Sequence, residues 1–154
     1  PEKTDRVRYS RQAWTKNEIC TVYSANIGDK EAKQKGVIMT VRESYEKIGS
    51  NFDEVLRRLG SEALVKRFAL KFLNDTSFQD LKDALVKKDG ETAFRAAHTL
   101  KGVCLNLGFD RLYEVSAELT EKLRGRDTSG TEEMFKKVET QYRILTDAIR
   151  EMEQ

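Results

Sequence analysis

The sequence predicts an all-α protein, an antiparallel up-down four-helix bundle with additional short helical segments near the N-terminus. Three observations carry this prediction. From about residue 53 onward, apolar residues recur at helical spacing, and no alternating strand pattern is present. The only proline of the 154 residues is Pro1, so no helix interior is interrupted by a proline ring. The segments between the apolar patterns are short, which makes consecutive helices antiparallel neighbours.

Two short helices are expected first. A helix over 53–59 has its apolar residues on one side, and Gly60 after it favours a left-handed helix end. A second helix over 62–74 has apolar residues at i, i+3, i+4, i+7 and i+8, which is one face of a 3.6-residue helix. Thr76 and Gln79 fit a capping box, and they are expected to open a third helix.

The following helix is expected over 91–107. Asp89 and Gly90 before it form a turn signal, and Gly108 after it closes it. Its apolar residues alternate between spacings of four and three, which defines one buried stripe. The stripe consists of Ala93, Ala97, Leu100, Cys104 and Leu107.

Two more helices complete the expected bundle. Asp110 can cap the first of them, which ends near Gly125. Residues 125–130 are the clearest loop of the chain, and Ser129 with Glu132 forms another possible capping box. The last helix has a sustained apolar seam. This seam consists of Phe135, Val138, Tyr142, Leu145, Ile149 and Met152.

Composition divides the chain into an extension or linker over 1–36 and a helical bundle over 37–154. The extension lacks periodicity and holds eight basic and five acidic residues, whereas the bundle carries a net charge of −1. A tail without structure explains the extension equally well. A nearly neutral bundle argues against a nucleic-acid partner, because binding a phosphate backbone needs a concentrated positive charge.

His98 is the only histidine of the chain. On a helix that turns about 100° per residue, it lies about 140° from the centre of the apolar stripe of the 91–107 helix. We therefore expect its side chain to be exposed. An imidazole has an ordinary pKa near 6.5, so its neutral form is available as a nucleophile at neutral pH. This position suggests a covalent phosphoryl carrier, although many exposed histidines have no function.

Four residues at helical spacing surround His98. Lys101 can offset the negative charge of a phosphoryl group. Gly102 places bare backbone beside the ring, at a cost of about 0.5–1 kcal/mol relative to alanine. Phe94 and Leu105 make an apolar patch around a polar centre, which is typical of a protein-docking site. Each residue also has an alternative interpretation. Lys101 can be a solvated charge, and Gly102 can allow close packing of helices. Phe94 and Leu105 can be covered by other parts of the chain.

Short motifs surround His98. The central one is AHTLKG at 97–102, followed by NLG at 106–108. In these motifs the chain resembles the histidine phosphotransfer (HPt) domains of bacterial phosphorelays. The segments FLND at 72–75 and DLxxAL at 80–85 are also similar to the family pattern. The resemblance covers about residues 50–154 and is specific, because the short motif falls on the matching helix of the helical order.

The resemblance implies a role for each residue around the motif. His98 is the phosphorylated residue, Lys101 assists the phosphoryl group and Gly102 admits the partner. On the next helix, Thr120 and Arg124 occupy positions that contact the partner or the imidazole in the family. Thr120 is shorter than the glutamine or glutamate often found there, and this departure puts a hydrogen bond to the imidazole in doubt.

The implied partners are response-regulator receiver domains. A receiver with a phospho-aspartate docks over His98, transfers the phosphoryl group and supplies Mg²⁺, and another receiver then takes the group over. The chain itself is expected to hold no cofactor or metal. It has no P-loop or glycine-rich fingerprint, so it is expected not to phosphorylate itself from ATP. It acts as a phosphoryl carrier, either as a separate protein or as part of a hybrid sensor kinase.

Further expectations concern location and assembly. No run of about 18 apolar residues is present, so no membrane contact is expected. Cys20 and Cys104 show no disulfide or zinc spacing, which favours the cytoplasm, including the cytoplasmic portion of a membrane-anchored sensor kinase. A monomer is expected, because the apolar stripes are about as wide as a bundle core requires.

The main alternative is a helical protein-interaction module without phosphoryl chemistry. Its exposed apolar residues would bind a partner, and His98 would be incidental. A metal-binding bundle is disfavoured, because Arg95 rather than glutamate stands three residues before the only histidine. DNA binding is disfavoured as well, because no basic recognition helix is present.

Overall fold

The computed structural model describes residues 39–153, so the predicted extension over 1–36 lies outside the described residues. Helices make up most of the described part, and no strand occurs within it. The predicted all-α class is therefore confirmed. In chain order the elements are α3 (Val41–Lys47), α4 (Phe52–Leu59), α5 (Glu62–Phe72), α6 (Ser77–Val86), α7 (Gly90–Leu107), α8 (Asp110–Lys122), the 3-10 turn η1 (Leu123–Gly125) and α9 (Glu132–Glu153).

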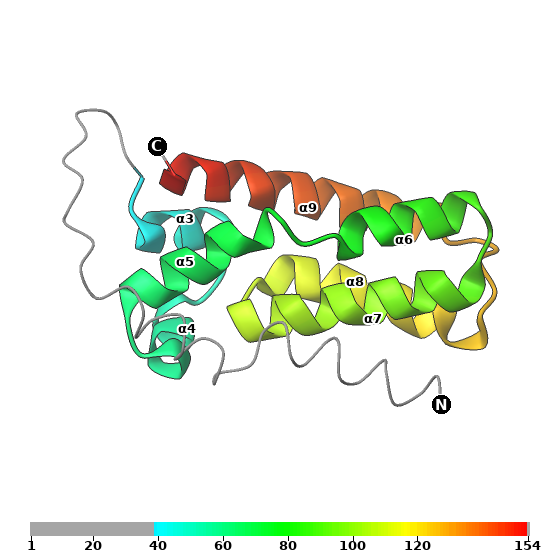
Figure 1. Ribbon diagram of the computed structural model, residues 1–154, viewed down its shortest axis with the longest axis horizontal. Helices are drawn as coiled ribbons and strands as arrows, with labels where there is room; N and C mark the ends of the chain where they lie inside the picture. Colours follow the sequence, from blue (N-terminus) through cyan, green and yellow to red (C-terminus); the bar gives the residue numbers. More distant parts are fainter. Residues whose placement is uncertain (1–38, 154) are drawn as a thin grey trace.

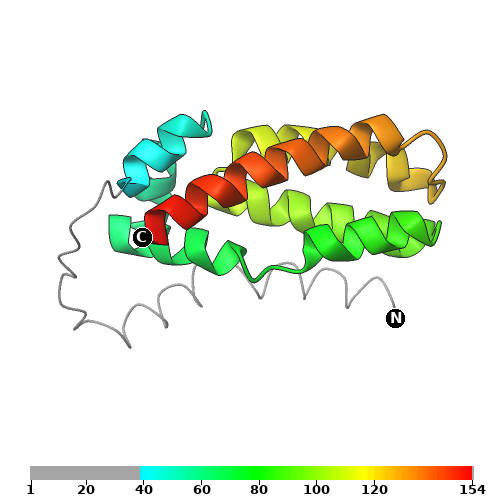
Figure 2. The same cartoon turned by 90° about the horizontal axis from the view of Figure 1, so that it is seen from above.

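Helices α6, α7, α8 and α9 form the bundle, and Figure 1 shows that they alternate in direction along the chain. Each packs against the next one in the sequence. The first and last helices also meet, because the Phe78 ring of α6 stacks on the Tyr142 ring of α9 with centroids 3.9 Å apart. Helix α9 then runs on to contact α5 (Figure 2). These contacts enclose one apolar core.

The helix ends at two glycines agree with the sequence prediction. Gly60 ends α4 and Gly108 ends α7, both in the left-handed region, with φ of 92° and 68°. A glycine adopts this conformation without steric cost. Gly108 is required for a second reason, because a Cβ at this position would overlap a methyl group of Val55. The turn after α7 therefore lies directly against α4.

The capping box predicted at Thr76 and Gln79 is wrong. Thr76 precedes α6 but has a helical backbone, and its side chain makes no cap hydrogen bond. Its hydroxyl donates to Asp80 at 3.0 Å. The backbone N–H of Ser77 instead donates to the Asp75 carboxylate at 2.9 Å, so the residue before Thr76 satisfies the helix start.

Two further predicted caps are also wrong. Phe109 stands at the N-cap of α8, and Asp110 lies inside the first turn, where a negative charge is favourable near the helix N-terminus. Helix α9 begins at Glu132, directly after Thr131. The Ser129 hydroxyl donates to Asp127 at 2.6 Å, within the loop. Both predictions placed the cap on the wrong residue, because the loop conformations were unknown.

Helix α3 is one of the short N-terminal segments that were expected without defined bounds. A capping box opens it, in which the Glu43 N–H donates to the Thr40 hydroxyl at 3.2 Å and the Thr40 N–H donates to the Glu43 carboxylate at 2.7 Å. Its buried Tyr45 hydroxyl donates to the Leu107 carbonyl at 2.9 Å. Helix α3 therefore braces the C-terminal end of α7.

Candidate functional site

Helix α7 separates a buried side from an exposed side, as the sequence predicted. The predicted stripe is fully buried, and Ala96 and Val103 are buried beside it. His98 is exposed, although it directly follows the buried Ala97. The buried stripe on which the helix rests consists of Ala93, Ala97, Leu100, Cys104 and Leu107.

Asp89 caps the N-terminal end of helix α7. The Thr92 N–H donates to the Asp89 carboxylate at 3.1 Å, and the Thr92 hydroxyl donates to it at 2.6 Å. These hydrogen bonds hold the pKa of Asp89 below its ordinary range. Asp89 thus has a defined role beyond the turn that the sequence indicated, because it is the N-cap of α7. His98 lies near the middle of this helix of 18 residues, away from both ends.

We define the His98 face as His98 together with Phe94, Lys101, Gly102 and Leu105, all on α7. Lys101 and Gly102 are half-buried, whereas the Leu105 side chain is 52% exposed. The Phe94 ring lies next to the His98 ring, with centroids 6.0 Å apart and planes inclined by 24°. The structure therefore brings the five predicted residues of α7 together on one side of the helix.

Two opposite charges lie close to Lys101, Glu121 at the end of α8 and Arg124 in η1. The Arg124 guanidinium donates to Glu121 at 2.7 Å. This hydrogen bond, together with a smaller contribution from the positive charge of Lys101, holds the pKa of Glu121 below its ordinary range. Lys101 is therefore within electrostatic reach of α8. Arg124 itself is exposed.

Thr120 does not contribute to this surface. Its side chain is 1% exposed, and its hydroxyl donates to the Ser116 carbonyl one turn earlier at 2.6 Å. It lies on the inner side of α8 next to the buried Leu119. The prediction that Thr120 contacts a partner is therefore wrong. Its side chain is buried and its hydroxyl is already hydrogen-bonded, so a partner cannot reach it.

Two arginines that sequence reasoning missed contact α7 near the face. The Arg126 guanidinium lies 3.8 Å from the centroid of the Phe94 ring. The Arg58 guanidinium, on α4, donates to the Leu105 carbonyl at 2.9 Å. Both residues come from other elements, so no spacing within the 91–107 segment could have indicated them.

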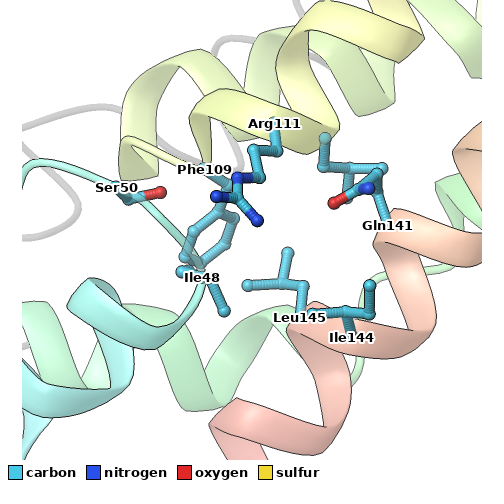
Figure 3. Close-up of a pocket in the computed structure, with 8 residues that line it drawn as sticks. Ile48, Ser50, Phe109, Arg111, Gln141, Ile144 and Leu145 are labelled. Carbon is cyan, nitrogen blue, oxygen red and sulfur yellow. The ribbon is translucent and has the colours of Figure 1, made fainter.

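A small pocket lies apart from the His98 face, between the end of α3, the start of α8 and the middle of α9. Figure 3 shows the polar ends of Arg111 and Gln141 beside it. None of the residues of the His98 face lines this pocket. Its lining consists of Ile48, Ser50, Phe109, Arg111, Leu112, Gln141, Ile144 and Leu145.

Two other kinds of site are absent from the described residues. Within 39–153, no group of three or more histidine, cysteine, aspartate or glutamate side chains is arranged to hold a metal ion. No helix of this part of the chain is both long and apolar enough to cross a membrane.

A family model described as "Hpt domain" matches residues 73–154, which is more than half of the chain. The match includes α6 to α9 and every residue of the His98 face, whereas α3, α4 and α5 precede it. No match was found among curated proteins or among solved structures.

Proposed function

Because the chain belongs to the Hpt domain family, we propose that His98 accepts a phosphoryl group from a receiver-domain aspartate and passes it to another receiver. Hpt domains take part in histidine phosphotransfer in phosphorelays, where they interact with receiver domains. The observation that carries the proposal is the exposure of the only histidine near the middle of α7, above a fully buried stripe. A nucleophile on such a helix needs little reorganisation before transfer.

The chemical step needs little from this chain beyond the imidazole. The lone pair of the unprotonated ring nitrogen of His98 forms the new N–P bond. The P–O bond of the aspartyl phosphate breaks, and its electron pair stays with the aspartate carboxylate. The attacking nitrogen carries no proton, so no general base is required. Catalysis then consists of positioning and charge stabilisation, as in phosphoryl transfer generally.

Lys101 and Gly102 have separate roles in this proposal. The Lys101 ammonium, one turn from His98, offsets the charge of the transferred phosphoryl group. Its positive charge also interacts with the carboxylate of Glu121 and helps to lower the pKa of that carboxylate. Gly102 carries no side chain beyond its Cα atom, and this leaves room for the receiver to approach the imidazole.

The remaining contacts bind the receiver. The half-exposed Leu105 and the Phe94 ring provide apolar contact, and Arg124 provides a charge at the edge of the surface. The receiver supplies the Mg²⁺ that neutralises the phosphoryl oxygens. We place this exchange in the cytoplasm, with the chain acting as a monomer.

A second candidate is a protein-interaction module without phosphoryl chemistry. The exposure of Leu105 favours it, because a large apolar side chain on the surface is a typical anchor for a partner. In that case, the His98→Gln variant binds its partner and supports signalling as well as the wild type. The two candidates therefore differ in one measurable property, the requirement for the imidazole.

The test is phosphoryl transfer from a phosphorylated receiver domain to the purified chain. We expect the wild type to gain a phosphoryl group that is labile in acid and stable in base, and His98→Gln to gain none. Both proteins should unfold at the same temperature, since His98 is exposed. Arg150→Gln is the control, because Arg150 pairs with Asp147 on α9, outside the His98 face. A folded wild type that stays unlabelled across a panel of receivers would contradict the proposal.

A further inference from the structure

The loop after η1 is held against the start of α7 by its backbone. Arg126 has a φ of 63°, in the left-handed region that residues with a Cβ rarely adopt. Its carbonyl oxygen lies so close to Gly90 that a Cβ at Gly90 would overlap it. The position of Arg126 relative to α7 is therefore fixed by close contact between two backbones.

The side chain of Arg126 is fixed as well. Its Nε atom donates to the Glu91 carboxylate at 2.7 Å, and its Nη1 atom donates to the Arg124 carbonyl. The planar guanidinium then lies 3.8 Å from the centroid of the Phe94 ring. This is the close arrangement in which a cation is attracted to the face of an aromatic ring. The Arg126 side chain is 34% exposed, so most of its surface is withdrawn from water.

The contact continues from Phe94 to His98. The two rings are one helical turn apart, with centroids 6.0 Å apart and planes inclined by 24°. An exposed side chain normally samples several rotamers, and a ring held beside it removes some of them. The loop after η1 is thus connected through one aromatic ring to the nucleophile.

We propose that Arg126 is a positioning residue for His98, which holds the Phe94 ring in place and so limits the orientations of the imidazole. This inference rests on the proposed phosphotransfer function. Arg126 does not touch the phosphoryl group in this proposal. It increases the fraction of time in which His98 faces an incoming receiver, and this effect raises the rate of the transfer step.

The first test is spectroscopic and does not depend on transfer. His98 is the only histidine, so its imidazole C–H signals are unambiguous in an NMR spectrum of the full chain prepared without a histidine tag. The nearby Phe94 ring shifts these signals by its ring current. We expect Arg126→Gln to move the signals toward their positions in Phe94→Leu. Arg150→Gln, which also breaks an arginine–carboxylate pair, should leave them unchanged.

The second test is the rate of transfer from a phosphorylated receiver. We expect Arg126→Gln to lower the rate at saturating receiver by about fivefold, with little change in the receiver concentration that gives half the maximal rate. Arg126→Lys should not restore the rate, because an ammonium keeps the charge but not the planar guanidinium group. In a Phe94→Leu background, Arg126→Gln should have no further effect, because the ring through which it acts is gone.

Three results would overturn the inference. One is an Arg126→Gln protein whose His98 signals coincide with those of the wild type. Another is an unchanged rate at saturating receiver, and the third is an equal loss of rate with and without the Phe94 ring. If the wild type takes up no phosphoryl group, the proposed function fails and the role of Arg126 in transfer fails with it. The NMR comparison then still decides whether Arg126 orients His98.

Discussion

At Gly90, two distant parts of the backbone approach each other closely. A Cβ at this position would overlap the carbonyl oxygen of Arg126, and neither partner is the movable end of a side chain. Gly125, which directly precedes Arg126, provides a contrast, because a Cβ there would have no neighbour within 4 Å. One glycine is thus required by a close approach, whereas the other occupies open space.

At the residue scale, we expect Gly90→Ala to lower the free energy of unfolding by about 2 kcal/mol, because the loop must move away from α7. This loss is net of the gain that alanine normally brings to a helix. Gly125→Ala should change the free energy by no more than about 0.5 kcal/mol. Urea unfolding of both variants measures the difference. Equal unfolding midpoints would show that the loop moves away from α7 without lowering the free energy of unfolding.

At the scale of the element, α7 depends on Asp89 for its N-terminal end. The carboxylate accepts two hydrogen bonds from Thr92, and these keep its pKa below the ordinary range. A depressed folded-state pKa means that the folded protein favours the charged form. Its contribution to stability is therefore present above the unfolded pKa and is lost as the pH falls through the folded pKa.

We expect Asp89 to make the stability of the protein depend on pH in the acid range. Between about pH 5 and about pH 2, the wild type should lose more stability than Asp89→Asn, whose amide oxygen also caps a helix but does not titrate. The other carboxylates are common to both proteins, so the difference isolates Asp89. Urea unfolding at several pH values tests this. Parallel stability curves for the two proteins would contradict the assigned capping role.

The apolar spacing was sufficient to predict the helices of the bundle. The stripe that includes Ala97 and Leu100 is buried, and Gly60 and Gly108 end their helices in the left-handed conformation. Periodicity succeeds here because a helix must bury its apolar side. The predicted caps failed at Thr76 because several nearby polar side chains can satisfy the same backbone N–H, and only the loop geometry decides which one does.

The candidate site was predictable only where its residues share one helix. His98 and Leu105 follow from their spacing on α7, and both are exposed. Arg126 could not be predicted, because its contact with Phe94 depends on a left-handed loop residue and on the packing of two elements. Thr120 was assigned by resemblance, and its burial depends on how α8 is rotated about its axis.

At the scale of the whole molecule, the core extends beyond the residues that match the family. Phe109, at the turn before α8, packs against Phe72 of α5 with centroids 5.2 Å apart and against Tyr45 of α3 at 5.8 Å. The matched part begins only at residue 73. Helices α3 to α5 therefore complete the core of the bundle at the end where α7 stops.

We accordingly expect a fragment of residues 73–154 to lose cooperative unfolding. Removing the earlier helices would expose Leu107, Phe109 and Met152, which are at most 1% exposed in the full chain. Thermal unfolding followed by circular dichroism, together with the binding of a hydrophobic dye, compares the fragment with the full chain. A fragment that unfolds as sharply and at the same temperature would show that α3 to α5 are dispensable for the bundle.

The division of α7 into a buried and an exposed side has a consequence for the divergence of duplicated copies. If His98 and Leu105 meet the receiver as proposed, substitutions there alter recognition, whereas the fold depends on the buried side of the helix, which includes Ala97. The two properties are therefore encoded in interleaved but separate positions of one helix. A duplicate can acquire a new partner through successive surface substitutions, each of which leaves a folded protein on which selection continues to act.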